Sequence, residues 1–200
     1  MFAKNEELIL NLFRKNIFLN ATMREISILL KKAYPKIYDS LLNLESKKII
    51  DMKKIGNSKV CSLSLNKESL SILAYLEEQE AFSVNIPNIN KILEFNEFLD
   101  DIIIVTGSYA KSKQTKKSDI DLILIVKDKA FEKHKLMENL TMTESPEIHV
   151  NCFSYKDFLD MLLSKEENLG KEVFKYHLIF RNTERYYLLI KEAIKNGFRG

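Results

Sequence analysis

Two aspartates separated by one residue, Asp119 and Asp121, stand at the start of an apolar run, residues 122–126. Side chains at positions i and i+2 of a strand share a face, so both carboxylates are expected to point the same way. An earlier apolar run, residues 102–105, leads to Gly107-Ser108, where we expect a sharp turn into a helix. Amides at such a turn bind phosphate, and paired carboxylates bind divalent cations. The pattern predicts metal-dependent chemistry on a nucleoside triphosphate.

A Gly-Ser turn followed by Asp-x-Asp on the next strand resembles the signature of the nucleotidyltransferase superfamily related to DNA polymerase beta, in particular its minimal branch. The matching residues are Gly107, Ser108, Asp119 and Asp121. The resemblance implies that the turn holds the triphosphate and that the two aspartates bind Mg²⁺ or Mn²⁺. It also implies that a hydroxyl attacks the α-phosphate while pyrophosphate leaves. The alternative is a surface turn followed by solvated aspartates. Two carboxylates at the start of a buried strand favour a functional site instead.

The resemblance also implies a third carboxylate on a neighbouring strand, which helps to hold the metal and activates the hydroxyl. The candidate strand, residues 146–152, alternates, with Glu147 and His149 on one face. The usual position of the acid, between two apolar residues, is occupied by His149, and Glu147 lies one pleat earlier. A neutral imidazole suits Zn²⁺ or Mn²⁺ better than Mg²⁺. Either residue could therefore complete the site, or His149 could be a polar residue on an open sheet face.

Lysines follow the Gly-Ser turn closely, and Lys111 is the nearest of them. Its ammonium could neutralise triphosphate charge or contact a nucleic-acid acceptor. The alternative is that these lysines form a solvated helix face. We include Lys111 with Gly107 and Ser108 among the predicted nucleotide-binding residues.

The N-terminal third of the chain is basic and patterned differently. Residues 1–68 hold 13 basic and 7 acidic residues, a net charge of +6, while the remainder holds 18 and 21, a net charge of −3. Helical spacing of apolar residues predicts three helices, with Thr22 and Glu25 as a capping box and Pro35 in the first turn of the third. Gly56-Asn57 predicts a hairpin turn. This order resembles the winged helix-turn-helix family over residues 4–66.

The winged-helix resemblance implies DNA binding through the third helix and the hairpin. The candidate contacts are Lys36, Asn43, Lys53, Lys54 and Lys59. Asn43 is the strongest candidate for reading a base, because the exposed face of the third helix has no arginine, and the lysines suit phosphate contacts. The alternative is a basic winged helix used for dimerisation or protein contacts.

The predicted fold class is α/β (α+β), with a winged helix followed by a nucleotidyltransferase-type mixed sheet and C-terminal helices. The segments are a winged helix at 1–68, a connecting helix and linker at 69–91, a transferase core at 92–155 and a helical segment at 156–200. We expect one helix over residues 90–99. The apolar face at residues 186–190 either completes the core, which we favour, or makes a dimer contact.

Several protein classes are disfavoured by the sequence. No apolar run approaches the eighteen or so residues that span a membrane. The N-terminal segment does not have the pattern of a signal peptide. Cys61 and Cys152 are far apart and form neither a disulfide framework nor a metal motif, which is consistent with a reducing cytoplasm.

Two functions fit these patterns. The first is a metal-dependent nucleotidyltransferase that moves a nucleoside monophosphate from an NTP, with ATP favoured, to a hydroxyl acceptor, with the winged helix on DNA. Its acceptor could also be a protein, because minimal nucleotidyltransferases resemble antitoxins of two-gene systems that adenylylate a toxin partner. The second is a DNA-binding transcriptional regulator whose transferase-like domain is a degenerate nucleotide sensor or interaction module. A homodimer is compatible with both.

Overall fold

The computed structural model describes residues 2–200 and divides into two compact units that meet between Leu76 and Glu77. This boundary falls inside helix α4 (Lys67–Ser83). The segment that we expected to connect the domains, residues 69–91, therefore begins as part of a continuous helix. Among residues 2–200, no helix is both long enough and apolar enough to cross a membrane.

The first unit has the element order of a winged helix. Its elements are α1 (Lys4–Lys15), β1 (Ala21–Thr22), α2 (Met23–Leu29), α3 (Tyr34–Ser46), β2 (Ile50–Ile55) and β3 (Ser58–Leu63). The strands form an antiparallel sheet in the order β1–β3–β2. The hairpin of β2 and β3 is the wing, and it follows the three helices as predicted.

The local signals in this unit act as the sequence predicted. The Thr22 hydroxyl accepts a hydrogen bond from the Glu25 amide at 3.2 Å, and the Glu25 carboxylate accepts one from the Thr22 amide at 2.7 Å. Pro35 lies in the first turn of α3. Gly56 has a φ of +58° and opens the two-residue turn of the wing, a conformation that glycine adopts without steric cost.

The second unit is built on a mixed four-stranded sheet. Its elements after α4 are α5 (Ile89–Leu93), the 3₁₀ helix η1 (Asn96–Phe98), β4 (Ile102–Thr106), α6 (Gly107–Ala110), β5 (Ile120–Val126), α7 (Ala130–Thr141), β6 (Ile148–Ser154), α8 (Tyr155–Leu163), α9 (Leu169–Lys175), β7 (Leu178–Arg181) and α10 (Thr183–Lys195). The strand order is β6–β5–β4–β7. Strands β5 and β6 are parallel, and the other pairs are antiparallel.

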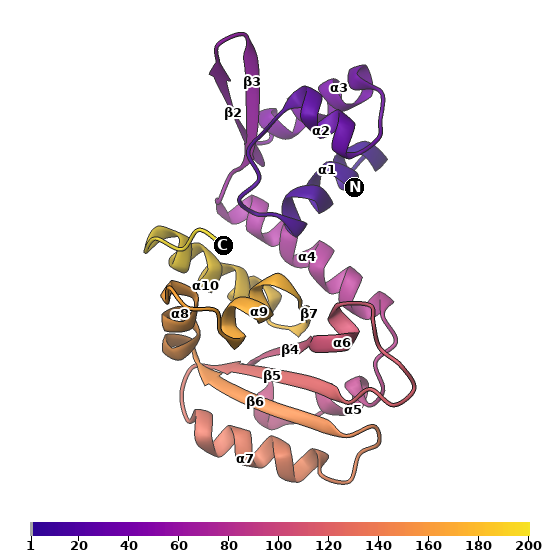
Figure 1. Ribbon diagram of the computed structural model, residues 1–200, viewed down its shortest axis with the longest axis vertical. Coiled ribbons are helices and arrows are strands. Elements are labelled where there is room, and N and C mark those ends of the chain that lie inside the picture. The colour runs from indigo at the N-terminus through magenta and orange to yellow at the C-terminus, as the bar shows by residue number, and fades with distance from the viewer. Residues whose placement is uncertain (1) are drawn as a thin grey trace. The chain divides into compact units, whose positions relative to one another are not determined.

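Helices cover both faces of this sheet (Figure 1). Side chains of β5 such as Ile120 and Leu122 share a buried cluster with Ile92 of α5 and Met137 of α7. Asp121 has the opposite parity in β5, so its side chain lies on the other face, the one covered by α8 and α10. The position of Asp121 along β5, odd where Ile120 and Leu122 are even, therefore decides on which face of the sheet its carboxylate lies.

Two sequence predictions for this unit are wrong. The single helix expected at residues 90–99 is interrupted, because α5 ends at Leu93 and η1 begins at Asn96. The segment after α9, expected to be helical, forms strand β7, which pairs with β4. A short apolar run such as Leu178–Phe180 suits a strand or a helix equally, and pairing with a sheet edge decides between them.

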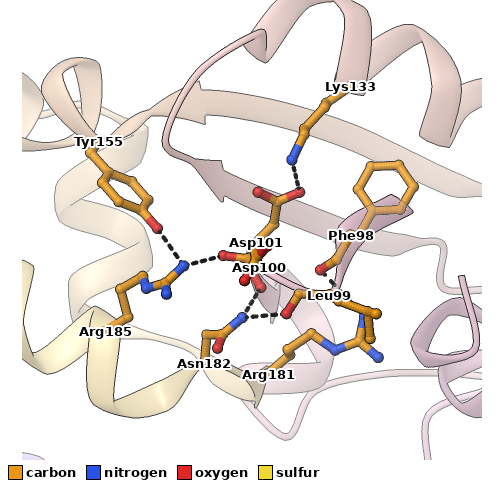
Figure 2. Close-up of polar contacts among 9 residues, drawn as sticks. All are labelled: Phe98, Leu99, Asp100, Asp101, Lys133, Tyr155, Arg181, Asn182 and Arg185. Atoms are coloured by element: carbon orange, nitrogen blue, oxygen red, sulfur yellow. Dashed lines mark hydrogen bonds and ion pairs between the residues drawn. The ribbon is translucent and has the colours of Figure 1, made fainter. Parts of the chain in front are cut away.

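A polar network fastens the segment before β4 to β7, α7 and α10 (Figure 2). The Asp101 side chain is buried, with the residue 1% exposed, and forms an ion pair with Lys133 of α7. The Asn182 amide donates hydrogen bonds to the carbonyl groups of Leu99, at 2.9 Å, and Asp101, at 2.8 Å. Two guanidinium groups donate to other carbonyls of the segment, from Arg181 to Phe98 and from Arg185 to Asp100. These bonds fix the start of β4. Gly107 follows directly after the end of the same strand.

Candidate nucleotide and metal site

The turn after β4 is packed against a carboxylate of β5. Thr106 pairs with Asp121 across the two strands, and Gly107 has a φ of +67°. A Cβ atom on Gly107 would lie 1.9 Å from Oδ2 of Asp121, far inside van der Waals contact. The close approach requires glycine at this position. The structure thus brings together two of the predicted elements, the turn and the aspartate.

The Gly-Ser turn starts the short helix α6. The first amides of a helix have no partner within the helix, so those at Gly107 and Ser108 can donate hydrogen bonds to an external acceptor. The following residues close the turn, because the Lys111 amide donates to the Gly107 carbonyl at 3.1 Å and the Lys113 amide to the Ser108 carbonyl at 2.9 Å. The turn has the form expected of a phosphate-binding element.

Three of the predicted catalytic side chains form a cluster at the start of β5 and β6. Ligand atoms of Asp119, Glu147 and His149 all lie within 4.8 Å of one another, and the three residues are exposed. The His149 Nε2 atom is 3.5 Å from Asp119 Oδ2. In the parallel register, Asp121 lies opposite His149. Both residues that the sequence offered as the third ligand are therefore on the site face.

This donor set fits a divalent cation. Carboxylate oxygens are the ligands that Mg²⁺ and Mn²⁺ prefer, and an imidazole nitrogen shifts the preference towards Mn²⁺ or Zn²⁺. The exposure of the three residues leaves space for other ligands around an ion. Asp119 and Asp121 with Glu147 or His149 could hold a metal here.

Lys111 lies beside the site but already has partners. Its Nζ is 2.6 Å from a carboxylate oxygen of Glu172 in α9 and 5.1 Å from the ring centre of Tyr176. The hydrogen bond that Lys111 donates to Glu172 is the main cause of a raised pKa of Lys111, and the charge of Asp121 adds to it. Sequence reasoning missed Glu172 and Tyr176, since neither belongs to a motif. They reach Lys111 only through the fold of α9 and β7.

The predicted DNA contacts of the winged helix differ in their surroundings. Lys36, Lys53, Lys54 and Lys59 are exposed. The Asn43 amide instead donates a hydrogen bond to the buried carboxylate of Glu6 in α1, which is also 3.2 Å from Lys47 Nζ. Base reading by Asn43 stays a prediction.

Comparisons with known proteins bear on the second unit. A family model described as "Nucleotidyltransferase domain" matches residues 86–198, more than half of the chain. The chain therefore belongs to the nucleotidyltransferase domain family. The matched range contains the Gly-Ser turn, both aspartates, Glu147 and His149.

Other comparisons add little. Among solved structures, MepR, a transcription regulator of the Staphylococcus aureus multidrug efflux pump MepA, is similar at 18% identity and a TM-score of 0.32. The similarity covers 46% of this chain and 73% of that chain. The comparison with curated proteins finds no match. The winged-helix assignment rests on the element order and strand pairing described above.

Proposed function

We propose that this protein transfers a nucleoside monophosphate from an NTP, with ATP favoured, to a hydroxyl acceptor, and that its winged helix binds DNA. Membership of the nucleotidyltransferase domain family supports nucleotidyl transfer. The observation that carries the proposal is the packing of Gly107 against Asp121, beside the cluster of Asp119, Glu147 and His149. A phosphate-binding turn and a metal-ligand set on one sheet face are the two parts that this reaction needs.

Each part has a separate task. The amides of Gly107 and Ser108, with Lys111, bind the phosphates. Asp119 and Asp121, completed by Glu147 or His149, hold Mg²⁺ or Mn²⁺. When bound, the cation neutralises triphosphate charge and polarises the α-phosphate.

The transfer is an in-line exchange of oxygens at phosphorus. The acceptor oxygen forms a bond to the α-phosphorus, while the bond from that phosphorus to the bridging oxygen breaks and pyrophosphate leaves with the bond's electrons. The hydroxyl proton passes to a base. Glu147 and His149 are the candidates, because both side chains are exposed at the site.

Label transfer from α-phosphate-labelled NTPs tests the proposal. Wild-type protein with Mg²⁺ or Mn²⁺ should incorporate label into an acceptor, and the Asp119→Ala/Asp121→Ala double variant should not. Asp128→Ala is a matched control, because this exposed aspartate lies beyond the opposite end of β5. Label transfer that survives in the double variant would disprove the assignment.

The roles of Glu147 and His149 can be separated by single substitutions. Glu147→Gln and His149→Gln are compared for metal-dependent NTP affinity. The residue whose replacement weakens affinity is a metal ligand. If both variants bind like wild type, strand β6 does not complete the site.

One observation favours a second candidate function. At the position where the family resemblance implies a carboxylate, His149 lies in register with Asp121. If this replacement abolishes chemistry, the protein is a DNA-binding regulator whose transferase domain senses nucleotide. DNA affinity that changes with NTP, without label transfer to any acceptor, would support this candidate.

The remaining parts of the proposal concern the acceptor, the oligomeric state and the cellular location. A protein acceptor, such as a toxin partner, and a homodimer stay predictions. We also propose a cytoplasmic location, where NTPs are made.

A further inference from the structure

The winged-helix unit contains an open cleft of about 780 Å³. It is lined by residues of α2, the first turns of α3 and the turn of the wing, among them Arg24, Tyr34, Tyr38, Asn57 and Lys59. A volume of this order accommodates a nucleotide-sized ligand. No local sequence pattern predicts the cleft, because its walls come from three separate segments.

Two tyrosines supply an aromatic wall. Tyr34 and Tyr38 are one helical turn apart in α3, and their ring centres are 5.9 Å apart with the planes tilted by 43°. Tyr34 is 45% exposed, and Ile28 of α2, which also lines the cleft, is 66% exposed. Apolar and aromatic surface exposed in a cleft is a favourable place for a flat ring to stack.

The charge of the cleft is positive. Arg24 and Lys59 line it, and neither forms an ion pair with any residue of the described range 2–200. Among the described residues, none that lines the cleft is acidic. A ligand that suits the cleft therefore combines a flat ring with negative charge.

We infer that this cleft binds an unpaired nucleotide of a single-stranded nucleic acid, with the base against Tyr34 and Tyr38 and the phosphates beside Arg24 and Lys59. Proteins bind single strands through basic grooves and aromatic stacking. A duplex keeps its bases stacked inside and cannot fill the aromatic part of the cleft.

The inference rests on the proposed nucleic-acid role of the winged helix. It does not depend on the chemistry of the transferase unit.

Fluorescence anisotropy with the full chain tests the inference. The probes are a short fluorescein-labelled single strand of mixed sequence, as DNA and as RNA, and each probe annealed to its complement, without NTP or divalent metal. The single strand should bind at least about tenfold more tightly than the duplex. Tyr34→Ala and Tyr38→Ala should each weaken single-strand binding by about tenfold, because each removes a stacking surface.

Three variants distinguish stacking from damage to the fold. Tyr34→Phe and Tyr38→Phe keep the ring and should retain the affinity. Tyr75→Ala removes another exposed tyrosine of the same unit, outside the cleft, and should also bind normally. Circular dichroism checks that the variants are folded.

Equal affinity for single strand and duplex would overturn the inference. So would wild-type affinity in both alanine variants. Arg24→Gln provides an independent check at an exposed position, and unchanged single-strand binding there would contradict the phosphate contact. Because label transfer is measured separately, failure here is distinguishable from failure of the proposed reaction.

Discussion

At the scale of single residues, the contact between Gly107 and Asp121 is the most constrained feature of the site. No side chain fits between the turn and the carboxylate, since a Cβ would lie 1.9 Å from Oδ2. Any larger residue must displace Asp121 or the turn. The geometry of the phosphate-binding and metal-binding parts is therefore linked through one glycine.

Gly107→Ala should lower label transfer by at least about a hundredfold, because a displacement of about 1 Å at a reacting centre has that effect. Gly56→Ala in the wing is the matched control. Gly56 has a similar φ of +58°, but a Cβ there meets nothing within 4 Å. If both variants retain normal label transfer, the close approach to Asp121 is not required for activity.

The ion pair of Lys111 with Glu172 predicts opposite effects from its two members. Lys111→Ala should raise KM for the NTP by about tenfold, because it removes a charge-assisted phosphate contact. Glu172→Gln should lower KM several-fold, because it frees Lys111 and removes a like charge near the triphosphate. Steady-state kinetics measures both.

Lys127→Ala is the control for net charge, because Lys127 is exposed and follows β5 at the end away from Asp121. It should leave KM unchanged. A raised KM in Glu172→Gln would show that the carboxylate positions Lys111 rather than competing with the NTP.

At the scale of elements, the network around Asp101 holds β4 in place. Removing one member of a buried ion pair leaves the other charge without a partner. Asp101→Ala should lower the free energy of unfolding of the second unit by about 3 kcal/mol. Urea unfolding followed by circular dichroism measures the change.

Asp100→Ala is the control for this prediction. Asp100 is exposed and enters the network through its backbone carbonyl, which accepts from Arg185. Its substitution should leave stability within about 0.5 kcal/mol of wild type. Equal effects at both positions would show that the Lys133 pair is not the source of the stability.

The N-terminus of α8 has a pH-dependent cap. Hydrogen bonds from the Ser154 side chain, and then from its amide, lower the pKa of Asp157 below its ordinary value of 3.8. The ionised carboxylate therefore stabilises the folded state fully above pH 3.8, and this contribution is lost as the pH falls through the lower folded pKa. Asp157→Asn should be less stable than wild type at neutral pH.

The difference between Asp157→Asn and wild type should shrink at acid pH, because wild type then also loses the charge. Urea unfolding of both proteins at neutral and at acid pH measures this difference in stability. Asp160→Asn, an exposed position of the same helix, serves as the control and should show no such convergence. A difference that stays constant with pH would contradict the cap.

At the scale of the whole molecule, charge is divided unevenly along the chain. Residues 1–68 carry a net charge of +6, and the remainder carries −3. Nucleic-acid binding by the first unit should therefore weaken steeply with salt, through release of counterions. Binding that does not change between low and high salt would argue against phosphate contacts.

Lys53→Ala/Lys54→Ala should reduce the slope of log K against log salt by about 1.5, for two lost phosphate contacts. Lys191→Ala/Lys195→Ala removes the same charge from exposed positions of α10 and should leave the slope unchanged. Anisotropy titrations over a range of salt concentrations measure both. Equal changes in slope would indicate a general effect of net charge.

Predictions from the sequence succeeded where a few neighbouring residues decide the structure. The capping box of Thr22 and Glu25 depends on local hydrogen bonds, the turn at Gly56 on backbone freedom, and the strand that carries Asp121 on a continuous apolar run. The placement of Asp121 beside the Gly-Ser turn was also predictable, because the family resemblance implied that the two elements form one site. These features require no knowledge of distant contacts.

Only the tertiary structure decided the remaining features. Strand β7 exists because β4 offers it an edge, and Lys111 meets Glu172 because α9 returns to the turn. Asn43 is bonded to Glu6 because α1 packs beside α3. In each case the partner lies tens of residues away, and a single side chain carries no signal of which distant group will reach it. Local chemistry thus determined the reacting groups, and packing determined their neighbours.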